Sequence, residues 1–150
     1  MSPSTLESLG KGTYLYERTW QMEWFCIAKI VVPENVSVSS NVGLAFGSVG
    51  FLDFYVDYGH CWGIELTCEG EKLNEHAKQF EGGGIYTDIP LNQWAILDFK
   101  KKKKNVRVPK QNFWYIILYS EDYKNVTIKR KDCIDLNITL KGDVKSEQEY

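Results

Sequence analysis

Residues 51–68 read FLDFYVDYGHCWGIELTC, and this stretch decides the fold. Apolar and other side chains alternate in its first part, Phe51 to Asp57, and again in its second, Cys61 to Cys68, as they do in half-buried β-strands. The segment Tyr58-Gly59-His60 lies between them. We therefore expect a β-hairpin, with a three-residue loop that brings the two strands together antiparallel.

The loop length decides where two acidic side chains of this hairpin point. A three-residue loop pairs Asp57 with Cys61, and the same ladder then places Asp53 directly opposite Glu65 on one face. A two-residue loop would place these two carboxylates on opposite faces. Gly59 is compatible with the first register, and the sequence leaves both open.

In the first register the Cβ atoms of Asp53 and Glu65 lie about 5 Å apart. Facing carboxylates repel each other unless a cation neutralises them, and Mg²⁺ or Mn²⁺ prefers such oxygen ligands. A metal held there could activate water and stabilise charge on a phosphoryl group. The alternative is a strand pair that carries two unrelated surface acids.

The rest of the chain predicts a mixed α/β layer fold. Thr13 to Val32 is expected to be a helix, with Trp20, Trp24, Ile27 and Val31 as its buried stripe and with Glu17 and Glu23 at the edges of that stripe. A second helix is expected at Glu71 to Glu81, ended by Gly82-Gly83-Gly84. Further strands are expected at 42–46, 93–99, 113–119, 125–130 and 136–140.

The charge distribution is uneven although the net charge is only −2. Residues 50–98 contain nine acidic and two basic residues, whereas residues 99–113 contain seven basic residues and no acid. Such a segment is suited to contacting phosphates; the basic residues are Lys100, Lys101, Lys102, Lys103, Lys104, Arg107 and Lys110. The alternatives are a solvated loop and a nuclear-import-like run.

The length of 150 residues and the 43% hydrophobic content predict one domain, 1–150, with a core of about 13–142 and frayed ends. Composition excludes a disordered, collagenous or coiled-coil chain. We expect an intracellular protein, nuclear or cytoplasmic, because neither a signal peptide nor a membrane segment is visible. The four cysteines form no CxxC pair and are expected to be reduced thiols.

Several short motifs resemble the PD-(D/E)XK, or restriction-endonuclease-like, nuclease superfamily. They are the runs around Asp53 and Glu65, the segment 20–23 of the first helix, Glu75-His76 with Phe80, and Leu97-Asp98-Phe99. The pattern is most similar to the nuclease-like C-terminal domains of Crinkler-type effector proteins and related fungal proteins. The resemblance covers most of residues 14–142.

The resemblance implies an αβββαβ core with a mixed central sheet flanked by helices, here with extra C-terminal strands. It implies hydrolysis of phosphodiester bonds with Mg²⁺ or Mn²⁺. Residue by residue, it assigns Glu23 as the helix acid, Asp53 as the strand aspartate and Glu65 as the first residue of the E-x-K motif, all three as metal ligands. His76 would look into this catalytic site from the second helix; the alternative is a histidine that hydrogen-bonds helix to sheet.

Thr67 stands where the E-x-K motif has its lysine, which normally stabilises the charge that develops on the phosphoryl group. Lys72 and Lys78 are candidates to replace it, but both lie away from the sheet-facing stripe of the second helix. Lys100, just after the strand 94–99, is another candidate. We therefore expect weak or absent cleavage. Three functions remain. The first is a Mg²⁺-dependent nuclease acting on nucleic acid, with DNA the expected substrate. The second is an inactive nuclease-fold module that binds nucleic acid or a host protein. A small interaction domain without a nucleic-acid role is the third.

Overall fold

The computed structural model describes residues 17–43, 46–48, 50–57 and 59–139. Among them are two helices, α2 (Glu17–Val31) and α3 (Leu73–Phe80). The strands are β1 (Val38–Val42), β2 (Leu52–Val56), β3 (Trp62–Cys68), β4 (Gln93–Lys101), β5 (Trp114–Tyr119), β6 (Asn125–Lys129) and β7 (Leu136–Thr139). The order of elements is therefore α, three strands, α, and then four further strands.

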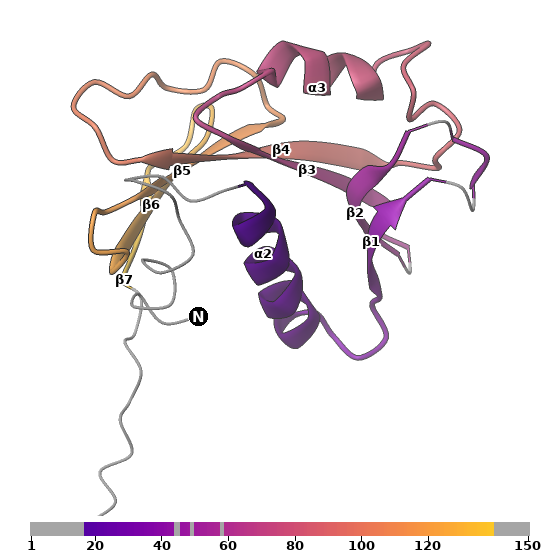
Figure 1. Ribbon diagram of the computed structural model, residues 1–150, viewed down its shortest axis with the longest axis horizontal. Helices are drawn as coiled ribbons and strands as arrows, with labels where there is room; N and C mark the ends of the chain where they lie inside the picture. Colours follow the sequence, from indigo (N-terminus) through magenta and orange to yellow (C-terminus); the bar gives the residue numbers. More distant parts are fainter. Residues whose placement is uncertain (1–16, 44–45, 49, 58, 140–150) are drawn as a thin grey trace, which may run out of the picture.

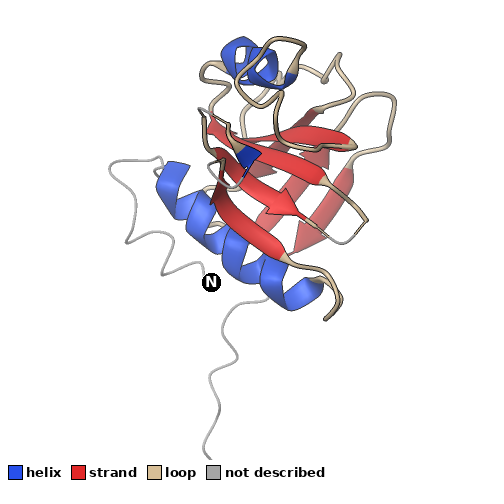
Figure 2. Ribbon diagram, turned by 90° about the vertical axis from the view of Figure 1, so that its right-hand side faces the viewer, coloured by secondary structure: helices blue, strands red, loops and turns tan. Residues whose placement is uncertain are grey.

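The strands form one seven-stranded mixed sheet in which sequence order is also spatial order. β3, β4 and β5 run parallel at the centre, and the pairs on either side of them are antiparallel. Helix α3 covers one face and α2 covers the other, so the domain has three layers (Figures 1 and 2). The mixed α/β layer fold predicted from the sequence is confirmed at this level.

Two crossovers join the parallel strands. The first, from β3 to β4, contains α3, and the second, from β4 to β5, is the irregular segment 102–113. Because crossovers between parallel strands are right-handed, both lie on the same face of the sheet. Figure 1 shows the second crossover above the sheet, on the side of α3. The basic segment predicted from the sequence therefore shares a face with α3.

Helix α2 packs against the sheet through aromatic residues. Trp20 stacks on Phe99 with ring centroids 4.5 Å apart, and Trp24 contacts Phe54 at 4.4 Å. The predicted stripe is wrong at its C-terminal half, because Ile27 and Val31 are 51% and 70% exposed. The buried side turns instead through Phe25 and Ala28. A helix that is apolar nearly all round gives no unique stripe, and the aromatic partners on the sheet select the face.

Helix α3 packs through Phe80, whose ring stacks on Trp94 at 4.4 Å with an interplanar angle of 2°. Gly63 of β3 makes room for this contact. A Cβ atom there would lie 3.1 Å from the Phe80 ring and from Leu91, tighter than ordinary contact. The glycine thus lets the end of α3 approach the sheet closely.

The predicted elements agree with the structure to within a few residues except for one strand. The strand expected at 42–46 is β1, which lies earlier, at Val38–Val42. The first residues of the predicted first helix and the frayed ends fall outside the described residues. No helix in the described part of the chain is long and apolar enough to cross a membrane.

Candidate functional site

The hairpin of β2 and β3 has the register that a three-residue loop requires. Phe54 pairs with Ile64 and Val56 with Trp62, and Asp53 and Glu65 lie directly beyond the Phe54–Ile64 pair. The two side chains interlock across the strands. Glu65 Oε1 accepts a hydrogen bond from the Asp53 amide at 3.1 Å, and Asp53 Oδ2 accepts one from the Leu66 amide at 2.9 Å. The predicted register is confirmed for residues 54–56 against 62–64, and just beyond these pairs the two carboxyl side chains each accept a hydrogen bond from the opposite strand.

Both oxygens of Glu65 are occupied by protein donors. Tyr86 donates its hydroxyl to Oε1 at 2.7 Å, and its oxygen also lies 2.9 Å from the Phe51 carbonyl oxygen. His76 Nδ1 lies 3.0 Å from Oε2. Glu65 is 3% exposed, so its charge depends on these partners in place of water. His76 therefore connects α3 to β3 through its contact with Glu65.

Two acids of this cluster, Asp53 and Glu17, have raised pKa values and hold their protons more tightly than isolated carboxyls. Burial, followed by the charge of Glu65, raises the pKa of Asp53 to about 7. Burial also raises the pKa of Glu17. The pKa of His76 is raised, chiefly by its hydrogen bond to Glu65. Near neutral pH the cluster thus reduces its own repulsion by retaining protons.

The helix acid that the structure brings to this cluster is Glu17. The charges of His76 and Glu65 act on it, and its Oε1 accepts a hydrogen bond from Gln21 at 3.2 Å. Glu23, the predicted helix acid, lies six residues further along, about 120° around the helix axis from Glu17. Both acids flank the predicted stripe, and the sequence could not choose between them.

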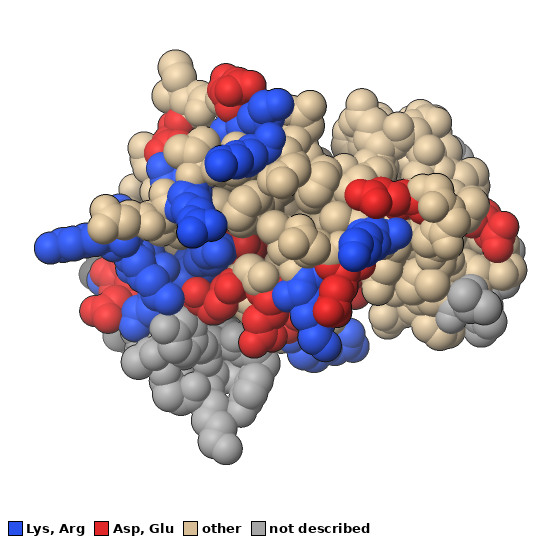
Figure 3. Space-filling view, turned by 90° about the horizontal axis from the view of Figure 1, so that it is seen from above, with Lys and Arg blue, Asp and Glu red and all other residues tan. Residues whose placement is uncertain are grey.

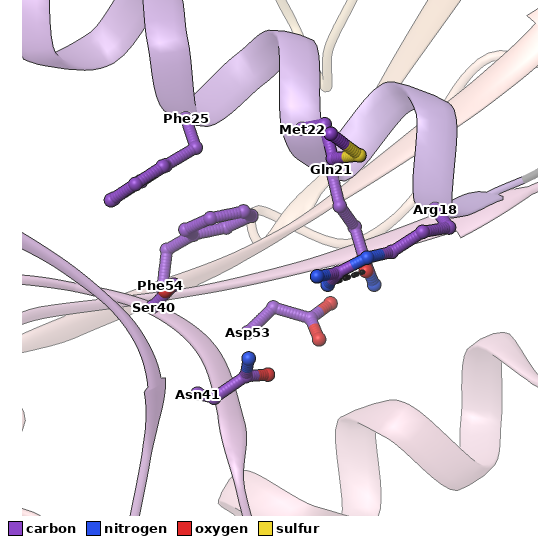
Figure 4. Close-up of a pocket in the computed structure, with 8 residues that line it drawn as sticks. All are labelled: Arg18, Gln21, Met22, Phe25, Ser40, Asn41, Asp53 and Phe54. Atoms are coloured by element: carbon purple, nitrogen blue, oxygen red, sulfur yellow. Dashed lines mark hydrogen bonds between the residues drawn. The ribbon is translucent and has the colours of Figure 1, made fainter.

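A small cavity opens between α2 and the start of β2. Figure 4 shows the Asp53 carboxyl pointing toward Arg18 and Gln21 of α2, with Asn41 of β1 beside it. The cavity volume is about 50 Å³, so it has space for water-sized groups and no larger ligand. Access to Asp53 is therefore narrow.

The fit to a divalent cation is incomplete in this arrangement. Among the described residues, no three His, Cys, Asp or Glu side chains are grouped as metal ligands. Glu65 would have to release Tyr86 or His76 to offer an oxygen. Thr67, at the lysine position, is fully buried and donates its hydroxyl to the Glu71 carbonyl at 2.7 Å. It points under the 69–72 turn and carries no charge.

The candidate replacements for the missing lysine occupy different places. Lys78 lies two residues from His76, about 160° around α3 from it. Lys100 lies 3.4 Å from Asp98 Oδ2. Lys72 precedes α3 and acts weakly on the charge of Glu17. None of the contacts described for these three lysines reaches Glu65.

Asp98 forms a second buried acid on the same face of the sheet. It is 0% exposed and accepts hydrogen bonds from the Gly70 amide at 2.8 Å and the Trp114 indole at 3.1 Å. Together with Lys100, these donors fasten the turn after β3 to β4 and β5. Burial raises the pKa of Asp98, and the donors oppose that shift. We assign it a structural role.

The basic segment is partly neutralised. Lys101 pairs with Glu121 at 3.0 Å and Lys103 with Glu69 at 3.5 Å, in addition to the contact of Lys100 with Asp98. The remaining predicted cations are exposed, and no ion pair is found for them among the described residues; they are Lys102, Lys104, Arg107 and Lys110. Figure 3 looks onto this face and shows Lys and Arg gathered on the side of the second crossover.

Tyr86 is the site residue that the sequence did not indicate. It follows the glycine run after α3, where no periodicity assigns it to a face. Its position depends on the turn 81–86, which the Tyr86 amide closes by donating to the Gln79 carbonyl at 3.0 Å. Only the folded loop brings its hydroxyl over Glu65.

No protein-family model matches this chain, and no curated protein or solved structure shows significant similarity to it.

Proposed function

We propose that this chain is a restriction-endonuclease-like domain that binds nucleic acid, with DNA the preferred partner, and whose hydrolytic centre is degenerate. The element order αβββαβ supports the fold assignment, as do acids contributed by α2, β2 and β3 to one cluster. The exposed cations of the second crossover lie on the same face of the sheet and supply the affinity for phosphates.

The main support for the proposal comes from Glu65 and Thr67, which occupy the first and third positions of the E-x-K pattern. Both oxygens of Glu65 hold protein donors, and Thr67 is buried without charge. Phosphodiester cleavage needs preorganised charge beside the phosphoryl group, and the loss of one such donor costs ~10²–10³ in rate. The site thus keeps the shape of the superfamily pattern without the group that acts on the transition state.

The test measures binding and cleavage in the same samples. Labelled DNA and RNA are incubated with the protein in EDTA, Mg²⁺ or Mn²⁺, and the products are separated on gels. We expect binding in all three conditions and no metal-dependent cleavage. A double variant, Lys102→Ala with Lys104→Ala, should weaken binding. Strong cleavage that Asp53→Ala abolishes would refute the degenerate centre.

A Mg²⁺- or Mn²⁺-dependent nuclease is the second candidate, and the clustered acids favour it. Asp53, Glu65 and Glu17 would hold the ion, which would supply an activated water and charge stabilisation when bound. Metal binding would then displace the protons that Asp53 and Glu17 retain through their raised pKa values. Proton release on titration with Mn²⁺, lost in Asp53→Asn, would support this candidate.

A role in binding a host protein, as the Crinkler-type resemblance implies, is the alternative partner for an inert module. It predicts that the charge variants leave partner binding intact while the affinity for nucleic acid, if any, is weak. A host-nucleus location also belongs to this alternative and is tested by imaging the tagged chain in cells.

A further inference from the structure

A groove of about 520 Å³ lies between the second crossover and the turn that joins β6 to β7. The crossover contributes Arg107, Pro109 and Lys110, and the turn contributes Lys131 and Asp132. Two cations of the crossover thus face one cation and one acid of the turn across an open concavity. The sequence pattern did not connect Lys131 with the basic segment, because more than twenty residues separate it from Arg107.

The walls of this groove are held in place by the fold. Pro109 is fully buried, and its ring fixes the backbone between the two crossover cations. The opposite wall follows β6, whose Lys129 pairs with Asp135 across the turn. That pair neutralises Asp135 and leaves Lys131 as the basic residue of the turn that lines the groove.

The groove and the lysine run lie near opposite ends of strand β5. Lys102 follows the end of β4, next to the end of β5, because its amide donates to the Tyr119 carbonyl. The β6–β7 turn lies beside the start of β5, because Lys129 pairs with Ile116. The six residues of β5 separate these two ends by about 20 Å, at ~3.3 Å per residue. One strand of B-DNA carries a phosphate every ~3.4 Å, so about six phosphates span that distance.

We propose that this groove is a phosphate subsite, in which Arg107, Lys110 and Lys131 contact the backbone of a nucleic acid that runs along the second crossover. The inference rests on the proposed function and adds Lys131 and the direction of the strand to it. Lys102 and Lys104 hold one end of the track, and the groove holds the other. Such contacts position a nucleic acid without reading its sequence.

The experiment measures binding of a short fluorescein-labelled DNA duplex by anisotropy over a series of NaCl concentrations. Each engaged phosphate contributes about 0.9 to the slope of log K against log salt. Arg107→Ala, Lys110→Ala and Lys131→Gln should each reduce the slope by about 0.9, and the triple variant by about 2.7. Lys29→Ala is the matched control, because Lys29 lies on α2, on the opposite face of the sheet.

The possible results distinguish a failure of the phosphate subsite from a failure of the proposed function. If the groove variants keep the original slope while Lys102→Ala with Lys104→Ala reduces it, the subsite is refuted and the proposed function stands. If the unaltered protein binds neither DNA nor RNA at low salt, both fail. Binding to anionic phospholipid vesicles without binding to either nucleic acid would overturn both in favour of a membrane partner. Thermal unfolding of each variant confirms that it is folded.

Discussion

The buried acid cluster makes the stability of this domain depend on pH, and Asp53→Asn tests the reason. The pKa of Asp53 is about 7 in the folded protein, against an ordinary value of 3.8. The folded state therefore binds a proton that the unfolded chain releases. Stability from this group is fully present below pH 3.8 and is lost as pH rises through about 7.

The size of this stability loss follows from the pH range between the two pKa values of Asp53. One pH unit between the two pKa values is worth about 1.36 kcal/mol, so the rise from about pH 5.5 to 7 costs up to about 2 kcal/mol. The groups that face Asp53 are Glu65 on β3, Glu17 on α2, His76 on α3 and Tyr86 in the loop after α3. The pKa values of Glu17 and His76 are also raised, so their contributions have the same sign.

The assay is urea unfolding followed by tryptophan fluorescence at several pH values. The unaltered protein should lose stability from about pH 5.5 to 8, and Asp53→Asn should remove about 2 kcal/mol of that loss. The amide oxygen of asparagine can still accept the bond from Leu66. Asp122→Asn is the control, because the Ser120 hydroxyl lowers the pKa of Asp122 and its titration lies below the window. An unchanged pH dependence in Asp53→Asn would refute the reasoning.

Three further substitutions test the site and the packing, each measured by urea unfolding. Thr67→Lys should destabilise the fold by about 2–5 kcal/mol, because it buries an ammonium group under the 69–72 turn. Thr67→Val should cost only about 1–3 kcal/mol, because it removes only the hydrogen bond to Glu71. Equal costs for the two variants would contradict the buried position of residue 67. Tyr86→Phe should cost about 1–3 kcal/mol by removing a donor from buried Glu65, and no loss would mean that the hydroxyl is not needed there. Trp24→Ala should cost about 3–5 kcal/mol and Val31→Ala less than about 0.5 kcal/mol, and the reverse order would restore the stripe predicted from the sequence.

The Thr67→Lys result bears directly on the sequence-based expectation. From the motif alone, a lysine two residues after Glu65 should point along the same strand face and restore cleavage. The strand face is as expected, but the turn after β3 covers it, since Thr67 donates to Glu71 and Asp98 binds Gly70. A lysine there would have to open this turn before it could reach a phosphate.

Local patterns predicted the strands well and the helix face less well. Strict alternation in β2 and β3 leaves one choice of face, and the loop length then sets the register of Asp53 and Glu65. Helix α2 offers apolar residues at most angles, so its orientation depends on partners such as Phe54 and Phe99 that lie far away in sequence. The same ambiguity concealed Glu17 as the acid that faces the cluster.

Contacts between irregular segments could not be predicted at all. Tyr86 and Lys131 both lie in turns, where no periodicity assigns a direction to the side chain. Each is placed by the closure of a loop against the sheet: Tyr86 over Glu65, and Lys131 beside the second crossover. Residues of this kind complete the candidate site and the groove, so the sequence motifs describe only the part of each that is built on strands.

The retained protons connect the two halves of the proposed function. A cluster of ionised acids would repel a polyanion lying on the same face of the sheet unless a metal neutralised it. Here Asp53, with its raised pKa, and the His76–Glu65 pair reduce the negative charge without an ion. On the proposed function, nucleic acid would then lie along the second crossover in the presence of EDTA. The contacts that occupy both carboxylate oxygens of Glu65 are therefore the reason to expect binding without a metal.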